Sequence, residues 1–144
     1  NYKKKINVCT KTFQALRIFV NKEVTELITG LIKATKLIKS GGKIIVVSFH
    51  SIEDKVVKYY FKNYSSSKSN PSRYIPEENK LPLILFNKQK KRFKTPDQNE
   101  LINNPASRSA KLRFAERSNQ EFNHPDKFEI KFKRYLDLES INDK

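Results

Sequence analysis

A chain of 144 residues is long enough for one domain with a modest hydrophobic core and too short for two. Its formal net charge of +15 at pH 7 indicates a polyanionic partner, either nucleic acid or an anionic membrane surface, although a lysine-rich composition from an AT-rich genome is a competing explanation. The single cysteine, Cys9, excludes an intramolecular disulfide, and no Cys/His spacing predicts a zinc site or another metal centre.

The first predicted element is helical. Between residues 10 and 39 no proline occurs, and apolar side chains recur with a period of 3.6 residues. These apolar positions are Phe13, Leu16, Val20, Val24, Leu27, Leu31 and Ile38. We predict one helix, or two helices joined near Asn21, that ends at Ser40-Gly41-Gly42 because glycine readily adopts the left-handed conformation of a helix C-terminus.

A short apolar segment follows the two glycines. Residues 44–49 are apolar on both faces apart from Ser48, a pattern typical of a strand in a parallel sheet with both faces covered. Ser51 is predicted to cap the next helix, with Asp54 completing a capping box, and this helix should continue to about Tyr64. The order helix, Gly-Gly, buried strand and helix predicts an α/β fold.

The second half of the chain has shorter predicted elements. Prolines and polar residues indicate loops, Thr95-Pro96-Asp97 has the pattern of a helix start, and alternating apolar residues predict strands. The predicted order is a surface loop at 65–82, one or two short strands within 83–94, a short helix from Thr95 to Asn104, a strand at 110–115 and a further strand around 128–132.

The end of the predicted buried strand is the first candidate site. Ligands of open α/β sheets bind outside the carboxyl ends of the strands, which is where Ser48, His50 and Ser51 are expected. A neutral imidazole there can form one hydrogen bond to a base or a ribose, whereas the alternative is a histidine that only satisfies a strand-end carbonyl. A serine–histidine hydrolase is a third interpretation, but no Gly-x-Ser-x-Gly turn surrounds either serine, and His124 lies near the end of the chain.

Polar residues of the first helix form a second candidate site. Gln14, Arg17 and Asn21 are spaced i, i+3 and i+7, so they share one helical face beside the apolar stripe. Guanidinium and amide groups bind phosphates and base edges bidentately, which favours an RNA contact. A solvated polar face is the alternative.

A third candidate site lies in the basic segment 88–117. Its density of lysine and arginine suits a phosphate backbone, and a charged surface without a ligand is the alternative. Within it, the residues that we expect to contact RNA are Arg108, Ser109, Lys111 and Arg113.

Three segments together resemble a known family. They are TKTFQALRIFVN (10–21), SGGKIIVVSFHSIEDKVVK (40–58) and NPASRSAKLRFAER (104–117), and they are similar to the C-terminal half of the ribosomal RNA small subunit methyltransferase H family. The resemblance covers about residues 9–118, and a departure from the family lies at Cys9-Thr10-Lys11, where a His-Pro is expected before the threonine pair. It implies a Rossmann-like class I methyltransferase sheet, with residues 43–49 as its fifth strand. It also implies methyl transfer from S-adenosylmethionine to the N4 atom of a cytidine in the decoding region of small-subunit ribosomal RNA.

The resemblance also implies what this chain lacks. The family binds S-adenosylmethionine through a glycine-rich loop and acidic residues that precede this region, and only Gly30, Gly41 and Gly42 occur here. Because the chain contains no methionine even at position 1, we expect a fragment whose cofactor-binding half is absent and which is inactive alone. Residues 1–118 would be the C-terminal part of the methyltransferase domain, and 119–144 an extension.

Two further expectations concern compartment and class. No apolar segment approaches the roughly 20 residues of a membrane helix, and residues 1–11 lack the apolar core of a signal peptide, so we expect a cytoplasmic protein with no membrane contact. The alternative to the enzyme is a small basic RNA-binding module without catalysis. The residues give no assignment of catalytic groups.

Overall fold

The computed structural model of the chain describes residues 8–65, 83–88 and 93–143. The elements in chain order are α1 (Val8–Val20), α2 (Glu23–Leu37), β1 (Lys43–Ser48), α3 (Ser51–Asn63), β2 (Phe93–Lys94), α4 (Gln98–Asn103), η1 (Pro105–Ser109), β3 (Lys111–Glu116), α5 (Asp126–Glu139) and η2 (Ser140–Asp143). Most of the predicted loop at 65–82 lies outside the described residues, and so do Lys90, Lys91 and Arg92 of the basic segment 88–117.

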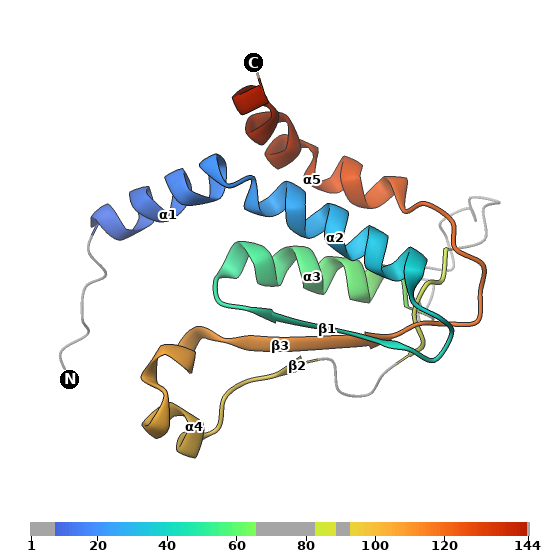
Figure 1. Cartoon of the computed structure of the whole chain (residues 1–144), viewed down its shortest axis with the longest axis horizontal. Helices are drawn as coiled ribbons and strands as arrows, with labels where there is room; N and C mark the ends of the chain where they lie inside the picture. Colours follow the sequence, from blue (N-terminus) through green and yellow to red (C-terminus); the bar gives the residue numbers. More distant parts are fainter. Residues whose placement is uncertain (1–7, 66–82, 89–92, 144) are drawn as a thin grey trace, which may run out of the picture.

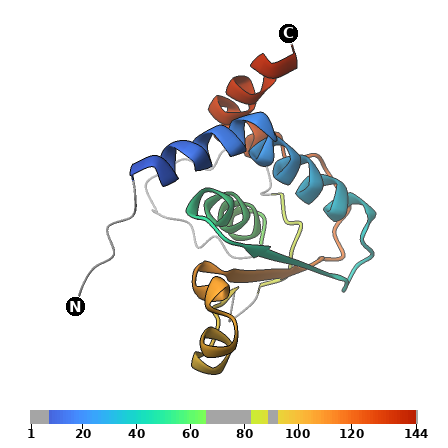
Figure 2. The ribbon, with the colours of Figure 1, turned by 60° about the vertical axis from the view of Figure 1, so that its left-hand side comes forward.

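The elements form layers on one side of a small sheet. Figure 1 shows α3 directly against the sheet, α2 beyond α3, and α5 crossing α2 on the outside, and α2 contacts both of the other helices. α1 continues away from these layers toward the N-terminus, and Figure 2 shows α4 projecting from the end of the sheet on the side opposite to the helices. The predicted α/β class is therefore correct.

The sheet is antiparallel, so the predicted parallel sheet is wrong for the described strands. The strand order is β1-β3-β2, and β1 pairs with β3 from Lys43 opposite Glu116 to Ser48 opposite Lys111. The strand β1 is also buried on one face only, because α3 covers that face while Ile45 and Val47 on the other are 61% and 49% exposed. Burial therefore alternates from residue to residue along β1, whereas the apolar segment predicts a strand covered on both faces.

The predicted helical start is confirmed as two helices. The helix is interrupted by a turn at Asn21 and Lys22, and Lys22 adopts a left-handed conformation with φ of 51°. After α2, Gly41 has φ of 80°, as the Ser-Gly-Gly segment predicts. At Gly42 a Cβ atom would lie 2.5 Å from Cγ1 of Ile38, so this turn also needs glycine for steric reasons.

The core lies among α2, α3 and α5 and is rich in aromatic rings. Tyr60 of α3 stacks on Phe128 of α5 with ring centroids 4.5 Å apart, and both side chains are fully buried. Phe132, one helical turn after Phe128, is buried on the same face, whereas Ile130 is exposed. The predicted strand at 128–132 is therefore wrong: the aromatic residues follow the i, i+4 spacing of a helix.

Candidate functional site

The amino end of α3 follows directly from β1 and is capped by His50. The His50 Nδ1 atom accepts a hydrogen bond from the Glu53 backbone N–H at 3.4 Å, and Glu53 Oε2 accepts from the backbone N–H groups of Phe49 and His50 at 3.0 and 3.5 Å. This reciprocal arrangement is a capping box. The predicted capping box at Ser51 and Asp54 is thus wrong by one residue, because Ser51 is already helical.

The second ring nitrogen of His50 lies between two carboxylates. Nε2 is 3.2 Å from Glu53 Oε1 and 3.5 Å from Glu23 Oε2, and the side chain is 9% exposed. Neither contact has hydrogen-bond geometry, so Nε2 is a buried nitrogen without an aligned acceptor among the described residues. Because Nδ1 accepts a backbone N–H, the proton of a neutral ring is on Nε2, the nitrogen that faces the two carboxylates.

The Glu23 carboxylate joins this histidine to the first helix. Arg17 Nε donates to Glu23 Oε1 at 2.7 Å, Arg17 Nη2 donates to Oε2 at 3.3 Å, and Asn21 Nδ2 donates to Oε1 at 3.5 Å. Burial acts to raise the pKa of Glu23, but the hydrogen bonds and charge of Arg17, with smaller effects from Asn21 and His50, hold that pKa below its usual value. We call Arg17, Asn21, Glu23, His50 and Glu53 the Glu23 cluster.

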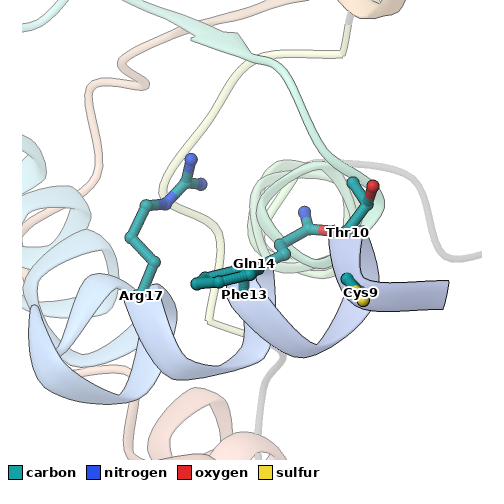
Figure 3. A pocket seen from close by; sticks show the side chains of 5 residues that line it. All are labelled: Cys9, Thr10, Phe13, Gln14 and Arg17. Atoms are coloured by element: carbon teal, nitrogen blue, oxygen red, sulfur yellow. The ribbon is translucent and has the colours of Figure 1, made fainter. Parts of the chain in front are cut away.

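Arg17 in α1 and Asn21 in the turn after it therefore belong to the cluster, and Gln14, the third predicted residue of this segment, lines a neighbouring pocket. Gln14 borders an open surface pocket of about 540 Å³ together with Cys9, Thr10, Phe13 and Arg17. Figure 3 shows Thr10, Gln14 and Arg17 pointing to the same side of α1. Phe13, the first residue of the apolar stripe, is 72% exposed, so the structure places an open aromatic ring beside polar groups. This combination can stack and hydrogen-bond an unpaired base.

A second carboxylate on α3 binds two cations of β3. Asp54 Oδ1 accepts from Arg113 Nε at 2.6 Å, and Oδ2 accepts from Lys111 Nζ at 3.1 Å. The Arg113 guanidinium also lies 5.1 Å from the centre of the Phe93 ring. Burial acts to raise the pKa of Asp54, but the hydrogen bonds and charges of Arg113 and Lys111 lower it overall. We call these residues, with Ser48, the Asp54 cluster.

The remaining predicted residues differ in exposure. Ser48 is buried, and its hydroxyl donates to the Lys111 carbonyl at 3.4 Å, while Arg113 is buried against Asp54. Arg108 and Ser109 in η1, and Ser51 at the start of α3, are exposed. The structure thus brings six of the ten candidates into the two clusters: Arg17, Asn21 and His50 in the Glu23 cluster, and Ser48, Lys111 and Arg113 in the Asp54 cluster. Gln14, Ser51, Arg108 and Ser109 lie outside both clusters.

The Glu23 cluster also has the composition of a divalent-cation site. One atom each of Glu23, His50 and Glu53 lie within 4.8 Å of one another. A metal ion would need the lone pair of His50 Nε2 and a proton on Nδ1, yet Nδ1 faces the Glu53 N–H. Arg17 also forms an ion pair with the Glu23 carboxylate, which competes with binding of a cation by that group. These two features favour a hydrogen-bonded cluster over a metal centre.

The sequence patterns missed the carboxylates Glu23, Glu53 and Asp54 as members of these clusters. Asp54 has the pattern of a capping residue, Glu53 that of an acidic residue in the first turn of a helix, and Glu23 has no local signal apart from its position after the predicted break near Asn21. Nothing in the spacing of Glu23 and His50 along the chain indicates that they meet.

Comparison with known proteins identifies the family. The model of the MraW methylase family matches residues 1–118, which is most of the chain. The chain belongs to this family. It is 45% identical over 114 residues to ribosomal RNA small subunit methyltransferase H of Bartonella bacilliformis, an alignment that covers 79% of this chain and 34% of the relative. It is 49% identical over 108 residues to the protein of the same name from Ehrlichia chaffeensis, covering 75% and 33%.

The resemblance to the methyltransferase H family is therefore confirmed, and it covers only a part of each relative's length. The chain spans about a third of the length of the curated relatives that it matches. The family match ends before α5, although α5 contributes to the core. In residues 8–65, 83–88 and 93–143 no helix combines the length and apolar character needed to cross a membrane.

Proposed function

We propose that this chain is the RNA-facing part of an S-adenosylmethionine-dependent methyltransferase that methylates the N4 atom of a cytidine in small-subunit ribosomal RNA. The observation that carries the proposal is the similarity to relatives named ribosomal RNA small subunit methyltransferase H, at 45% identity over most of the chain. The net charge of +15 supports a nucleic-acid substrate.

The described residues do not fit the cofactor. S-adenosylmethionine sites of Rossmann-like folds use a glycine-rich turn between a strand and a helix. Gly30 lies inside α2, and Gly41 and Gly42 precede a strand, while the turn from β1 to α3 contains no glycine. We therefore place the cofactor site in a part of the protein outside this chain, and we expect no binding of S-adenosylmethionine by the 144 residues alone at micromolar concentration. A tight site detected by calorimetry would contradict this placement.

The RNA-binding part of the proposal relies on exposed residues. Gln14 and Arg17 line the pocket of α1. Arg108 and Ser109 lie in η1, and the half-exposed Lys111 is the first residue of β3. Arg113 and Ser48 are buried, so we expect them to act through the Asp54 cluster, by holding Lys111 and the sheet in place. Ser51 is exposed at the first turn of α3 and could donate to a phosphate or ribose.

For His50, we propose a role in orienting the flipped cytidine or its backbone through the Glu23 cluster. Methyl transfer to a cytosine amine needs the base out of its stack and held in line with the methyl donor. His50 Nε2 is itself buried, so its effect would reach the RNA through Glu23 and the exposed Arg17. Asn21, which also binds Glu23, would have the same kind of role.

The proposal is tested with the full-length protein, small ribosomal subunits and methyl-labelled S-adenosylmethionine. We expect label in small-subunit RNA, and nucleoside mass spectrometry should identify it as N4-methylated cytidine. Label on another atom or another RNA would contradict the substrate, and no transfer by a folded protein that binds both S-adenosylmethionine and RNA would contradict the activity.

A non-catalytic RNA-binding module is the second candidate function. The observations that favour it are the high positive charge and the lack of a cofactor loop among the described residues. RNA binding without any affinity of the full-length protein for S-adenosylmethionine would support the module and exclude the enzyme.

A further inference from the structure

The end of α5 reaches the beginning of α2, 115 residues earlier in the chain. Glu139 Oε1 accepts a hydrogen bond from the Val24 backbone N–H at 3.2 Å, and Oε2 accepts from the Thr25 backbone N–H at 2.8 Å. The Thr25 hydroxyl also donates to Oε2. Glu139 is only 3% exposed, so this carboxylate is a buried group with three donors.

The helix α2 needs such a partner because its own sequence does not provide one. The first N–H groups of a helix have no intrahelical acceptor, and a side chain just before the helix usually supplies it. That position is Lys22, which has a left-handed backbone and no side-chain capping bond to the helix. Glu139 satisfies two of the N–H groups, and its negative charge is favourable at the positive end of the helix dipole.

The carboxylate is held in place by core packing. α5 lies beyond residue 118, outside the family match, yet Phe128 and Phe132 anchor it in the core. Phe132 contacts the Tyr59 ring edge-on at 5.5 Å, and Phe128 stacks on Tyr60. Glu139 therefore belongs to a helix that packs on α3, and His50 and Glu53 of the Glu23 cluster lie at the start of α3.

The residue directly before Val24 is Glu23. We propose that Glu139 is a positioning residue for the Glu23 cluster: by binding the first turn of α2, it orients the Glu23 carboxylate toward Arg17 and His50. The consequence for catalysis rests on the proposed function, whereas the consequence for the geometry does not. The C-terminal extension thus has a defined role at the site, although it lies outside the part shared with the family.

The geometry is tested by NMR on the full-length protein. Glu139→Gln keeps the shape of the side chain but replaces one acceptor with an N–H donor. We expect amide exchange at Val24 and Thr25 to accelerate by about ten-fold, the usual effect of losing a helix cap. We also expect the Arg17 Nε–H resonance to shift, because its acceptor Glu23 moves. Asp137→Asn, an exposed change on the same helix, should leave both signals at their wild-type values.

An accelerated exchange with an unchanged Arg17 resonance would overturn the proposal, because Glu139 would then be a cap with no effect on the cluster. Unchanged exchange would overturn it as well. If Glu139→Gln does not fold, Glu139→Asp is measured instead. Its carboxylate is one methylene shorter, so intermediate changes in both signals are expected, and a wild-type Arg17 resonance in that folded variant would also overturn the proposal.

The catalytic consequence is tested by methyl transfer. We expect Glu139→Gln to lower kcat by about three- to thirty-fold with unchanged affinity for S-adenosylmethionine. The matched variant is Leu136→Ala, which removes packing on the same helix without touching α2 hydrogen bonds and should keep kcat when both are assayed well below their melting temperatures. An equal loss of kcat in both variants would reduce Glu139 to a structural role. If the wild-type protein shows no methyl transfer, the proposed function fails while the NMR measurements still decide the positioning role.

Discussion

Two carboxylate–arginine pairs flank the start of α3, and they differ in exposure more than in geometry. Asp54 and Arg113 are joined at 2.6 Å, with side chains 12% and 9% exposed. Glu23 and Arg17 are joined at 2.7 Å, with side chains 20% and 55% exposed. In both pairs burial acts to raise the pKa of the carboxyl group, but the arginine, with Lys111 at Asp54 and with Asn21 and His50 at Glu23, lowers it overall. The same chemistry is therefore present in a buried and in a partly open environment.

This difference in exposure predicts different roles for the two pairs, one in stability and one in RNA contact. Removing one partner of a buried pair leaves an uncompensated charge in the interior, whereas an exposed pair is screened by water and contributes little to stability. The Asp54 pair connects α3 to β3 and is expected to stabilise the fold. The Glu23 pair leaves an arginine at the surface beside the α1 pocket, so its loss is expected to affect RNA contact more than folding.

The largest expected effect comes from breaking the buried pair. Asp54→Asn should lower the free energy of unfolding by about 3 kcal/mol, because the Arg113 charge remains buried without its partner. Urea unfolding of the full-length protein measures this loss. Asp137→Asn, which breaks the exposed pair with Lys133, is the control and should cost less than about 0.5 kcal/mol. Similar losses in both variants would show that burial does not distinguish the pairs.

His50 allows capping and recognition to be separated. His50→Asn keeps a good helix cap but removes Nε2, so we expect near wild-type stability and a methylation rate lower by about ten- to a thousand-fold, with unchanged affinity for S-adenosylmethionine. His50→Ala should lose the rate equally and, in addition, about 1 kcal/mol of stability. A wild-type rate in His50→Asn would leave the histidine with its capping role alone.

Replacing the exposed arginine should have a smaller effect. Arg17→Lys keeps the charge but loses the two-pronged contact to Glu23, so we expect a methylation rate about ten-fold lower and stability within about 0.5 kcal/mol of wild type. Steady-state kinetics and thermal unfolding check the two quantities. Lys36→Arg on the exposed surface of α2 is the matched control and should change neither. A stability loss in Arg17→Lys as large as that of Asp54→Asn would make the two pairs equivalent.

The smallest expected effect is a difference in acid stability. A carboxyl group whose pKa is lowered by folding stabilises the protein above its unfolded pKa of about 4, and this contribution is lost as the pH falls through the folded value. The stabilities of wild type and Asp54→Asn should therefore begin to approach each other as the pH falls below about 4, with the difference lost as the pH passes the lowered pKa of Asp54. The same comparison with Glu23→Gln should show a smaller gap at neutral pH, measured by urea unfolding from pH 3 to 7. Equal gaps would indicate equal coupling of both carboxylates to folding.

Local patterns predicted much of the fold. The two helices joined near Asn21, the Ser-Gly-Gly turn, the strand after it and the strand near 110–115 all follow from periodicity and turn chemistry, and the structure confirms them. The predictions that are wrong concern which elements of the fold pack against each other. The apolar segment at 44–49 predicts two covered faces, but one face is open in the described residues. The alternation at residues 128–132 predicts a strand, but Phe128 and Phe132 lie on a helix and pack against rings of α3.

The sequence by itself determined the family, the α/β class, the positive charge and the candidate residues Arg17, Asn21 and His50, because these depend on residue identity and short spacings. Only the tertiary structure decided that Glu23 joins them, that Arg113 is buried against Asp54, and that Glu139 caps α2. Each of these three contacts joins residues of different elements. Side-chain partners on different elements are selected by how the helices and strands pack against one another, which no local pattern encodes.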